Sequence, residues 1–215
     1  MSAPRLLIAT RSAGKLRELR EIFSAFNLEM VDPSSLGITE SAAEDTLESY
    51  DTFEDNALAK ARYFHELSGG LPTFGDDSGM CVDALGGEPG VYSKRWSGRE
   101  DLTGKLLDDA NNAKLVSRMQ EALLRDPFRY TDSARYVSVA AFKDRAGEVM
   151  RRGEIEGRVV LRPRGTGGFG YDPYFEAPDL GGTFAESTIE NTAALSHRAR
   201  AFRALLTALR AEGRV

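Results

Sequence analysis

The heptapeptide FGDDSGM, residues 74–80, places two neighbouring carboxylates, Asp76 and Asp77, between two apolar segments. The upstream segment PTF and the downstream segment CVDAL are both typical of buried strands. An unpaired carboxylate buried at such a point would destabilise the protein by several kcal/mol. We therefore expect the acidic pair in a turn between two strands, where solvent, backbone N–H groups or a metal ion compensate its charge.

Segments typical of strands and of helices alternate on both sides of this stretch. Together with one long hairpin, they predict an α/β fold with a mixed sheet flanked by helices. The chain has no repeat, low-complexity segment or linker, so residues 1–215 are expected to form a single domain. Strands are expected at 5–10, 28–31, 134–144 and 147–160, helices at 15–26, 53–67 and 101–124, and loops at 32–51, 86–90 and 165–173.

Capping residues and apolar spacing support the helices. Thr52 with Asp55 three residues later resembles a capping box, and Ser196 can cap a last helix. In the helix expected at 101–124, apolar residues are predicted to form one broad stripe. Its members are Leu106, Leu107, Ala110, Leu115, Met119 and Leu123.

The bulk composition excludes several classes of protein. A net charge of −5 gives no general attraction to nucleic acid or to anionic membranes. The single cysteine, Cys81, cannot form an internal disulfide, and we expect it to be buried in a strand. No segment approaches the ~20 apolar residues of a membrane span. We therefore expect a soluble, cytoplasmic protein.

A first candidate site is TRSAGK, residues 10–15, between the first strand and the first helix. Backbone N–H groups at a helix N-terminus, with Ser12 and Lys15, suit a phosphate group. The segment is not a Walker A loop, because it lacks that motif's first glycine and its final hydroxyl residue. The alternative is an ordinary strand–helix turn with a solvated lysine.

Carboxylates form a second candidate site. Glu48 precedes the helix expected at 53–67 and could join Asp77 in binding a hard divalent ion. Mg²⁺ commonly takes one or two carboxylates together with substrate phosphates. The alternatives are a solvated loop acid for Glu48 and turn-forming aspartates for Asp76 and Asp77. The flanking glycines favour the close approach of a ligand.

The segment GTGGFGYDP, residues 165–173, matches G-x-G-x-x-G, but the dinucleotide fingerprint must open a helix. Tyr171, Asp172 and Pro173 do not begin a helix, so a Rossmann site is rejected. A flexible glycine loop that presents Phe169 and Tyr171 suits a flat base, by stacking.

A fourth candidate is SHRAR, residues 196–200, at the start of the last helix. Arg198 can bind phosphate through two hydrogen bonds, and His197 can donate to a base carbonyl. The alternative is a solvated basic helix start, which the helix dipole disfavours. A bound anion would remove that penalty.

Taken in order, these segments strongly resemble the inosine triphosphate pyrophosphatase family. The resemblance covers residues 5–210 and is carried by five blocks of this sequence: T-x-x-x-x-K, E-x-x-x-TF-x-x-NA-x-x-KA, DDSG-x-x-VDALGG-x-PG-x-YS-x-R, GFGYDP-x-F and SHRARA. It implies an elongated, two-lobed α/β fold, usually dimeric, with a nucleotide in the cleft between the lobes and Mg²⁺ on its phosphates.

The resemblance also implies a role for each matching position. Asp77 matches the catalytic acid/base, and Glu48 and Asp77 are the expected metal ligands. Phosphates are expected at residues 10–15, with Asn56 and Lys60 on the same side. The full set of expected substrate contacts is Thr10, Arg11, Ser12, Ala13, Gly14, Lys15, Asn56, Lys60, Ser78, Phe169, Gly170, Tyr171, Asp172, Thr192, His197 and Arg198.

Three positions depart from the family pattern. Ser12 stands where the family usually has asparagine, Tyr50 where it has glycine, and Thr192 where it has lysine. The last change removes a cation from the expected substrate pocket. We expect Arg162 or Arg164, which precede the glycine loop, to compensate for it.

The expected reaction is hydrolysis of ITP, dITP or XTP to the monophosphate and pyrophosphate. Asp77 would position and deprotonate water for attack at the α-phosphorus, with Mg²⁺ on the phosphates. Lys15 and Lys60 would stabilise the departing pyrophosphate. Donors facing the purine 6-position would select an oxygen there over the amine of adenine.

RELREI, residues 17–22, resembles part of a Nudix helix, but the upstream Glu and Gly of that signature would fall at Ala9 and Ala3, so this reading fails. A catalytically weakened nucleotide-binding protein of the same fold stays open, with Thr192 as its mark.

Overall fold

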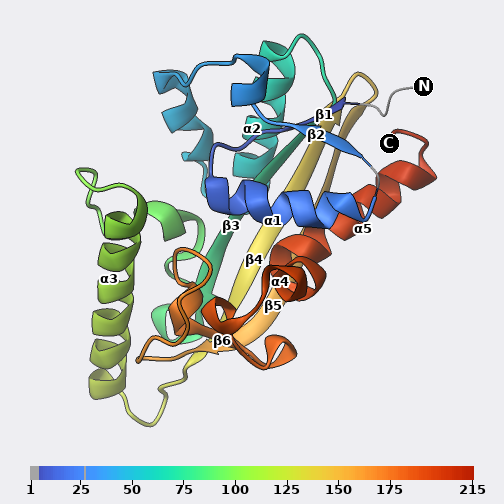
Figure 1. The fold of residues 1–215 in the computed structure, drawn as a ribbon. Coiled ribbons are helices and arrows are strands. Elements are labelled where there is room, and N and C mark those ends of the chain that lie inside the picture. The colour runs from blue at the N-terminus through green and yellow to red at the C-terminus, as the bar shows by residue number, and fades with distance from the viewer. Residues whose placement is uncertain (1–4, 27) are drawn as a thin grey trace. The chain divides into compact units, whose positions relative to one another are not determined.

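The computed structural model describes residues 5–26 and 28–215, and Figure 1 shows its elements. The described strands form one mixed sheet in the order β2-β1-β3-β4-β5-β6-β7. β1 pairs in parallel with β2 and β3, whereas β6 is antiparallel to β5 and β7. The strands are β1 (Arg5–Ile8), β2 (Glu29–Val31), β3 (Thr73–Val82), β4 (Ser133–Asp144), β5 (Gly147–Val159), β6 (Phe175–Ala177) and β7 (Gly182–Thr183).

The α-helices are α1 (Ala13–Ser24), α2 (Phe53–Leu67), α3 (Gly104–Arg125), α4 (Ile189–Leu195) and α5 (His197–Ala211). The predicted mixed sheet flanked by helices is therefore confirmed, as is the long hairpin of β4 and β5. Short 3₁₀ helices lie between these elements: η1 (Ser34–Leu36), η2 (Ala42–Glu48), η3 (Asp83–Leu85), η4 (Gly90–Arg95), η5 (Asp172–Tyr174), η6 (Pro178–Leu180) and η7 (Phe184–Glu186).

The predicted caps are confirmed. The Thr52 hydroxyl accepts a hydrogen bond from the Asp55 N–H at 3.1 Å, and α2 begins at the next residue, Phe53. The Ser196 hydroxyl accepts from the Ala199 N–H at 3.1 Å, and α5 begins at His197. These hydrogen bonds satisfy backbone donors that the first turn of a helix leaves unpaired.

The predicted turn at Asp76 and Asp77 is wrong. β3 runs without a break from Thr73 to Val82, and both aspartates lie inside it. The sequence indicated a turn because isolated buried carboxylates are unfavourable. In the structure, cations from helices that are distant in sequence compensate their charge.

The glycines beside the acidic pair serve close packing rather than a turn. A Cβ at Gly75 would collide with the backbone oxygen of Ala57 in α2. A Cβ at Gly79 would collide with the backbone oxygen of Gly90. From the sequence, these glycines were expected to allow the close approach of a ligand. In the structure, the groups that approach them belong to the protein's own backbone.

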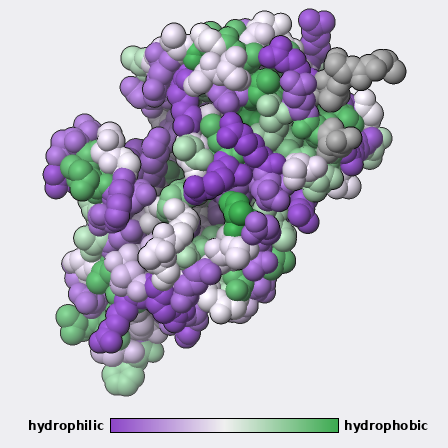
Figure 2. Space-filling view, viewed as in Figure 1, coloured by the Kyte–Doolittle hydropathy of each residue, from purple (hydrophilic) through white to green (hydrophobic). Residues whose placement is uncertain are grey.

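One further expectation needs correction. The loop expected at 32–51 contains η1 and η2, which the sequence did not indicate. The apolar stripe of α3 is only partly buried: Leu115 and Met119 are enclosed, whereas Leu106 and Leu123 are 65% and 37% exposed. On the face of the molecule shown in Figure 2, hydrophobic residues are interspersed among hydrophilic ones.

The described residues group into two compact units, each assembled from separate parts of the chain. The first unit comprises the described residues up to Asp77 with 138–153 and 196–215. Its core includes aromatic rings of α1, β3 and β4: the Phe23 and Phe142 centroids lie 5.1 and 4.7 Å from that of Phe74. The expectation of a single domain stays a prediction.

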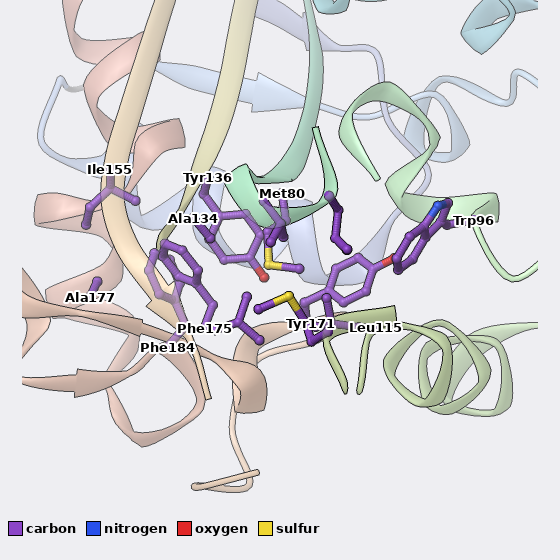
Figure 3. Close-up of a cluster of buried hydrophobic side chains, with 14 of the residues drawn as sticks. Met80, Trp96, Leu115, Ala134, Tyr136, Ile155, Tyr171, Phe175, Ala177 and Phe184 are labelled. Atoms are coloured by element: carbon purple, nitrogen blue, oxygen red, sulfur yellow. The ribbon is translucent and has the colours of Figure 1, made fainter. Parts of the chain in front are cut away.

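The second unit comprises residues 78–137 and 154–195. Figure 3 shows its core, in which Tyr136, Phe175 and Phe184 lie close together and Tyr171 lies beside Leu115 of α3. The predicted burial of Cys81 is confirmed. No helix in the described ranges has the length and apolar character needed to cross a lipid bilayer.

Candidate active site

Asp76 and Asp77 are both buried, with 3% and 5% of their surfaces exposed. Because successive side chains of a strand point to opposite faces, the two carboxylates contact different helices. Asp76 contacts Lys15 of α1 and Arg198 of α5, and Asp77 contacts α2. In Figure 1, α1 and α5 lie in front of the strands. One strand thus carries two neighbouring acids whose ion pairs are formed with different helices.

Asp76 is held by two cations. Lys15 Nζ lies 3.1 Å from Asp76 Oδ1, and Arg198 Nε donates to Asp76 Oδ2 at 3.2 Å. Burial alone would raise the pKa of Asp76, but the charges of Lys15, Arg198 and Lys60 outweigh it and hold that pKa well below its usual range. Asp76 is therefore ionised at neutral pH and suited to holding cations rather than to exchanging protons.

Arg198 has a second carboxylate partner that the sequence analysis missed. Its Nη1 forms a short ion pair with Glu18 of α1, and the other Glu18 oxygen accepts from the Ser196 hydroxyl at 2.6 Å. Burial lowers the pKa of Arg198, but Glu18 and Asp76 more than offset this and raise it. Glu18 lies one helical turn before the buried Ile22, and this position on the apolar face could have identified it.

Asp77 is held by α2. Asn56 Nδ2 donates to Asp77 Oδ2 at 2.9 Å, and Lys60 Nζ lies 3.3 Å from Asp77 Oδ1. Burial raises the pKa of Asp77, and the charges of Lys60 and Lys15 offset this only in part. Of the two acids, Asp77 is therefore the one whose environment favours taking up a proton.

Lys60 is buried and makes three polar contacts with the protein. Its Nζ donates to Glu48 Oε1 at 2.6 Å, to the backbone oxygen of Asp76 at 2.8 Å and to Asp77 Oδ1 at 3.3 Å. An ammonium has three hydrogens, so these contacts use all of its donors. Burial lowers the pKa of Lys60, but Asp77 and Glu48 more than compensate and raise it.

Both donors of the Asn56 amide are also engaged. Its Oδ1 accepts from the Tyr50 N–H at 3.0 Å, and its Nδ2 donates to the Tyr50 carbonyl at 3.3 Å and to Asp77. The amide thus ties the segment before α2 to the carboxylate of β3. In this structure Asn56 and Lys60 position Asp77, and their predicted contact with substrate would require an exchange of partners.

The segment from Thr10 to Lys15 leads from β1 into the first turn of α1. The Ser12 hydroxyl caps the helix by accepting from the Lys15 N–H at 3.4 Å, and the Thr10 hydroxyl accepts from the Ser12 N–H at 3.2 Å. Ala13 and Gly14 occupy the first turn. Burial lowers the pKa of Lys15, and Asp76 opposes this.

Arg11 points to a different part of the chain from Lys15. Its Nε and Nη2 each donate to a Glu44 oxygen at 2.7 Å, and Nη2 also donates to the Ile38 carbonyl at 3.1 Å. These bonds attach η2 and the preceding segment to the strand–helix junction. The predicted phosphate contact of Arg11 stays a prediction.

Glu48 and Asp77 each place an oxygen near one ammonium nitrogen, that of Lys60. Two hard oxygen ligands therefore lie beside the Lys60 ammonium group, and carboxylates of this kind bind a divalent ion together with phosphate and water. Among the described residues, no three His, Cys, Asp or Glu side chains are grouped to hold a metal ion without substrate.

His197 is buried at the start of α5, with 5% of its surface exposed. Burial lowers the pKa of His197 well below its usual value, and the charge of Arg198 adds to this effect. The imidazole is therefore neutral at pH 7, with one ring nitrogen as a donor and the other as an acceptor.

The glycine loop belongs to the second unit and is followed by the short 3₁₀ helix η5, which begins at Asp172, rather than by an α-helix of the kind that a Rossmann site requires. The Phe169 N–H donates to Asp172 Oδ2 at 2.8 Å, and Asp172 Oδ1 accepts from the Tyr136 hydroxyl at 3.1 Å. The Tyr171 hydroxyl donates to the Ser93 carbonyl at 2.9 Å. The Phe169 ring stays 38% exposed.

The two remaining predicted residues also belong to the second unit. Ser78 is half-buried in β3, directly after Asp77. The Thr192 hydroxyl donates to the Ile189 carbonyl of its own helix at 3.0 Å. Arg164, one of the arginines expected to compensate for Thr192, is ion-paired with Glu176 and Glu186.

Comparison with known proteins defines the class to which this α/β fold and its buried acid–lysine cluster belong. Residues 6–208 match the model of the Ham1 family. The chain therefore belongs to the Ham1 family, and the resemblance stated from the sequence is confirmed.

Curated relatives match along nearly their whole length. The chain is 44% identical to the dITP/XTP pyrophosphatase of Symbiobacterium thermophilum, covering 94% of this chain and 92% of the relative. It is 42% identical to the dITP/XTP pyrophosphatase of Shigella flexneri, covering 96% and 98%.

Solved structures show the same fold. A HAM1 protein from Coxiella burnetii superposes with a TM-score of 0.78 at 29% identity, covering 96% of this chain and 98% of the other. A nucleoside-triphosphatase, dITP/XTP pyrophosphatase, from Mycobacterium abscessus superposes with a TM-score of 0.66 at 38% identity, covering 94% and 98%.

Proposed function

We propose that this protein is an enzyme that hydrolyses dITP, XTP and ITP to the monophosphate and pyrophosphate, and so removes unusual purine nucleotides from the nucleotide pool. The observation that carries the proposal is the identity of 44% and 42%, over nearly whole chains, to relatives named dITP/XTP pyrophosphatase. The two buried acids of β3 and their lysines support it, because phosphoryl transfer depends on positioned charges.

Asp77 is the proton acceptor of the proposed reaction. Burial raises the pKa of Asp77, so the carboxylate is a better base than an exposed aspartate would be. It takes a proton from a water molecule that attacks the α-phosphorus, and pyrophosphate leaves with the electron pair of the broken P–O bond. Asn56 and Lys60 hold one carboxylate oxygen each and fix the direction of the base.

The cation of the proposed site is Mg²⁺, with Glu48 and Asp77 as its protein ligands. When bound, Mg²⁺ neutralises the phosphate charge. The two carboxylates offer hard oxygen ligands, which suit this ion better than softer metals.

Lys15 is the proposed cation for the departing pyrophosphate. Its Nζ forms an ion pair with Asp76 Oδ1 at 3.1 Å, and an ammonium group can donate up to three hydrogen bonds. Asp76, which stays ionised, opposes the lowering of the Lys15 pKa by burial and orients the ammonium group. The capped first turn of α1 adds backbone N–H groups on the same segment.

The purine is proposed to contact Phe169 to Asp172, with Thr192, His197 and Arg198 as the further residues implied by the family. The half-exposed ring of Phe169 supports this, since an aromatic side chain on a glycine loop can stack on a base. A neutral His197 can donate to a base carbonyl. We also expect a cytoplasmic homodimer that acts on free nucleotides and not on nucleic acid or membranes.

The proposal is tested by product analysis with purified protein, dITP and Mg²⁺ in ¹⁸O-labelled water. Attack at the α-phosphorus predicts equal amounts of monophosphate and pyrophosphate, with the label in the monophosphate. Activity should disappear in excess chelator and return with Mg²⁺. Nucleotide binding without turnover would instead identify a catalytically weakened nucleotide-binding protein.

A further inference from the structure

Two side chains of α3 form hydrogen bonds with the same residue of the glycine loop, Gly170. Asp108 Oδ2 accepts a hydrogen bond from the Gly170 N–H at 3.0 Å, and Asn112 Nδ2 donates to the Gly170 carbonyl at 3.0 Å. Asp108 and Asn112 are four residues apart and therefore lie on one face of the helix. Both polar groups of a single backbone residue are thus fixed by one helix.

The neighbours of Gly170 are held as well. Tyr171 is bonded to the Ser93 carbonyl and packs in the core beside Leu115 of α3, as Figure 3 shows. Asp172 accepts from both Tyr136 and the Phe169 N–H. Because the backbone is held at Phe169 and at Gly170, the Cα–Cβ bond of Phe169 points in a defined direction, while the residue itself stays partly exposed.

Asn112 gains little stability from its place. The side chain is buried, and its Oδ1 has no hydrogen-bond partner within the described residues. A buried acceptor without a partner is unfavourable by more than an ordinary hydrogen bond is favourable. An apolar side chain of similar size would avoid this penalty. The hydrogen bond from Asn112 to Gly170 is therefore better explained by its effect on the position of the glycine loop than by its effect on the stability of the fold.

We propose that Asp108 and Asn112 are positioning residues that set the backbone of Gly170 and thereby the orientation of Phe169 toward the purine. This inference rests on the proposed function, in which the glycine loop contacts the base. The two residues act through the loop and touch no reacting atom. Their loss should weaken substrate binding and leave the chemical step unchanged.

Four variants test the proposal. Asp108→Ala and Asn112→Leu each remove one hydrogen bond to Gly170, and both should raise KM for dITP about tenfold with kcat within about threefold. Asp108→Asn keeps an acceptor oxygen and should restore most of the affinity. Asp109→Ala is the matched control, because Asp109 is exposed and pairs with Lys105 on the same helix.

Hydrogen exchange at the Gly170 amide gives a second readout that needs no substrate. Exchange should be faster in Asp108→Ala than in the wild type and unchanged in Asp109→Ala, with melting temperatures within a few degrees. Unchanged exchange in Asp108→Ala, or KM values equal to those of Asp109→Ala, would overturn the inference. A wild-type protein that hydrolyses none of the three nucleotides would contradict the proposed function instead, and the exchange experiment would still decide whether α3 fixes the loop.

Discussion

Around Asp76 the contacts are ion pairs between buried charges, whereas around Gly170 they are hydrogen bonds between the backbone and one helix. The first set joins α1, β3 and α5, which are far apart in the sequence. Breaking a buried ion pair typically destabilises a protein by about 3–5 kcal/mol, against about 1 kcal/mol for an ordinary hydrogen bond. Changes near the acidic pair should therefore affect both rate and stability, and changes near the loop mainly affinity.

The largest effect is expected for Asp77→Asn. The variant keeps the shape of the side chain but cannot take up the proton of the attacking water, so kcat should fall at least ~10³-fold. Steady-state kinetics with dITP measure this, and a thermal melt establishes that the variant is folded. Activity within tenfold of the wild type would show that Asp77 is not the base.

Glu18→Gln should mainly lower stability. The substitution leaves the buried Arg198 with Asp76 as its remaining carboxylate among the described contacts, and we expect a loss of about 3 kcal/mol. Chemical denaturation measures the loss. Glu21→Gln on the exposed face of α1 is the control and should change stability by less than about 0.5 kcal/mol. Equal effects from the two variants would contradict the importance of the buried pair.

Features that depend on residues close together in the sequence could be predicted from it, whereas features that depend on distant residues could not. The cap at Thr52 and the bounds of α2 involve residues next to one another, and both were predicted. The position of Asp76 and Asp77 inside a strand was not, because their stabilising cations come from α1, α2 and α5. Glu18 was missed for the same reason, since its partner Arg198 lies 180 residues later.

The residues of the proposed site divide in a similar way. Asp77, Lys15 and Lys60 were expected from their motifs, and the structure brings them together in the first unit. Asn56 and Lys60 donate their hydrogen bonds to Asp77 and nearby groups. This could not be predicted, because a motif identifies residues but not their hydrogen bonds. Asp108 and Asn112 lay outside every motif and became visible only through their contacts with Gly170.

A smaller effect is expected in the pH dependence of stability. Burial raises the pKa of Asp77, so the folded protein binds this proton more tightly than the unfolded chain. Ionisation of Asp77 therefore lowers stability as the pH rises from its unfolded pKa through its folded pKa. Asp77→Asn removes this loss.

The melting temperature of Asp77→Asn minus that of the wild type should thus increase between pH 4 and pH 8. The lowered pKa of Asp76 acts in the opposite direction, but it is present in both proteins and cancels in the difference. A difference that is constant or decreases with pH would contradict the raised pKa.

The smallest effect is expected for Thr192→Lys. The Thr192 hydroxyl is bonded within its own helix, and the other residues matched to substrate binding are retained. We expect KM for ITP to change by less than about threefold, a difference below about 1 kcal/mol. Arg164→Ala and Arg162→Ala should raise KM if either arginine replaces the missing lysine, although Arg164 would have to leave Glu176 and Glu186. A tenfold gain in kcat/KM from Thr192→Lys would show instead that the site is weakened.

The central claim is that this fold hydrolyses unusual purine triphosphates and spares the common ones. The most direct measurement is the rate of pyrophosphate release by the wild-type protein with Mg²⁺, using dITP, XTP, ATP and GTP in parallel. We expect a kcat/KM for dITP and XTP at least ~10²-fold above that for ATP and GTP. A site that forms hydrogen bonds to the correct base rejects a base that leaves the hydrogen-bonding groups of the site unpaired. Equal rates on all four nucleotides, or no pyrophosphate from any of them, would contradict it.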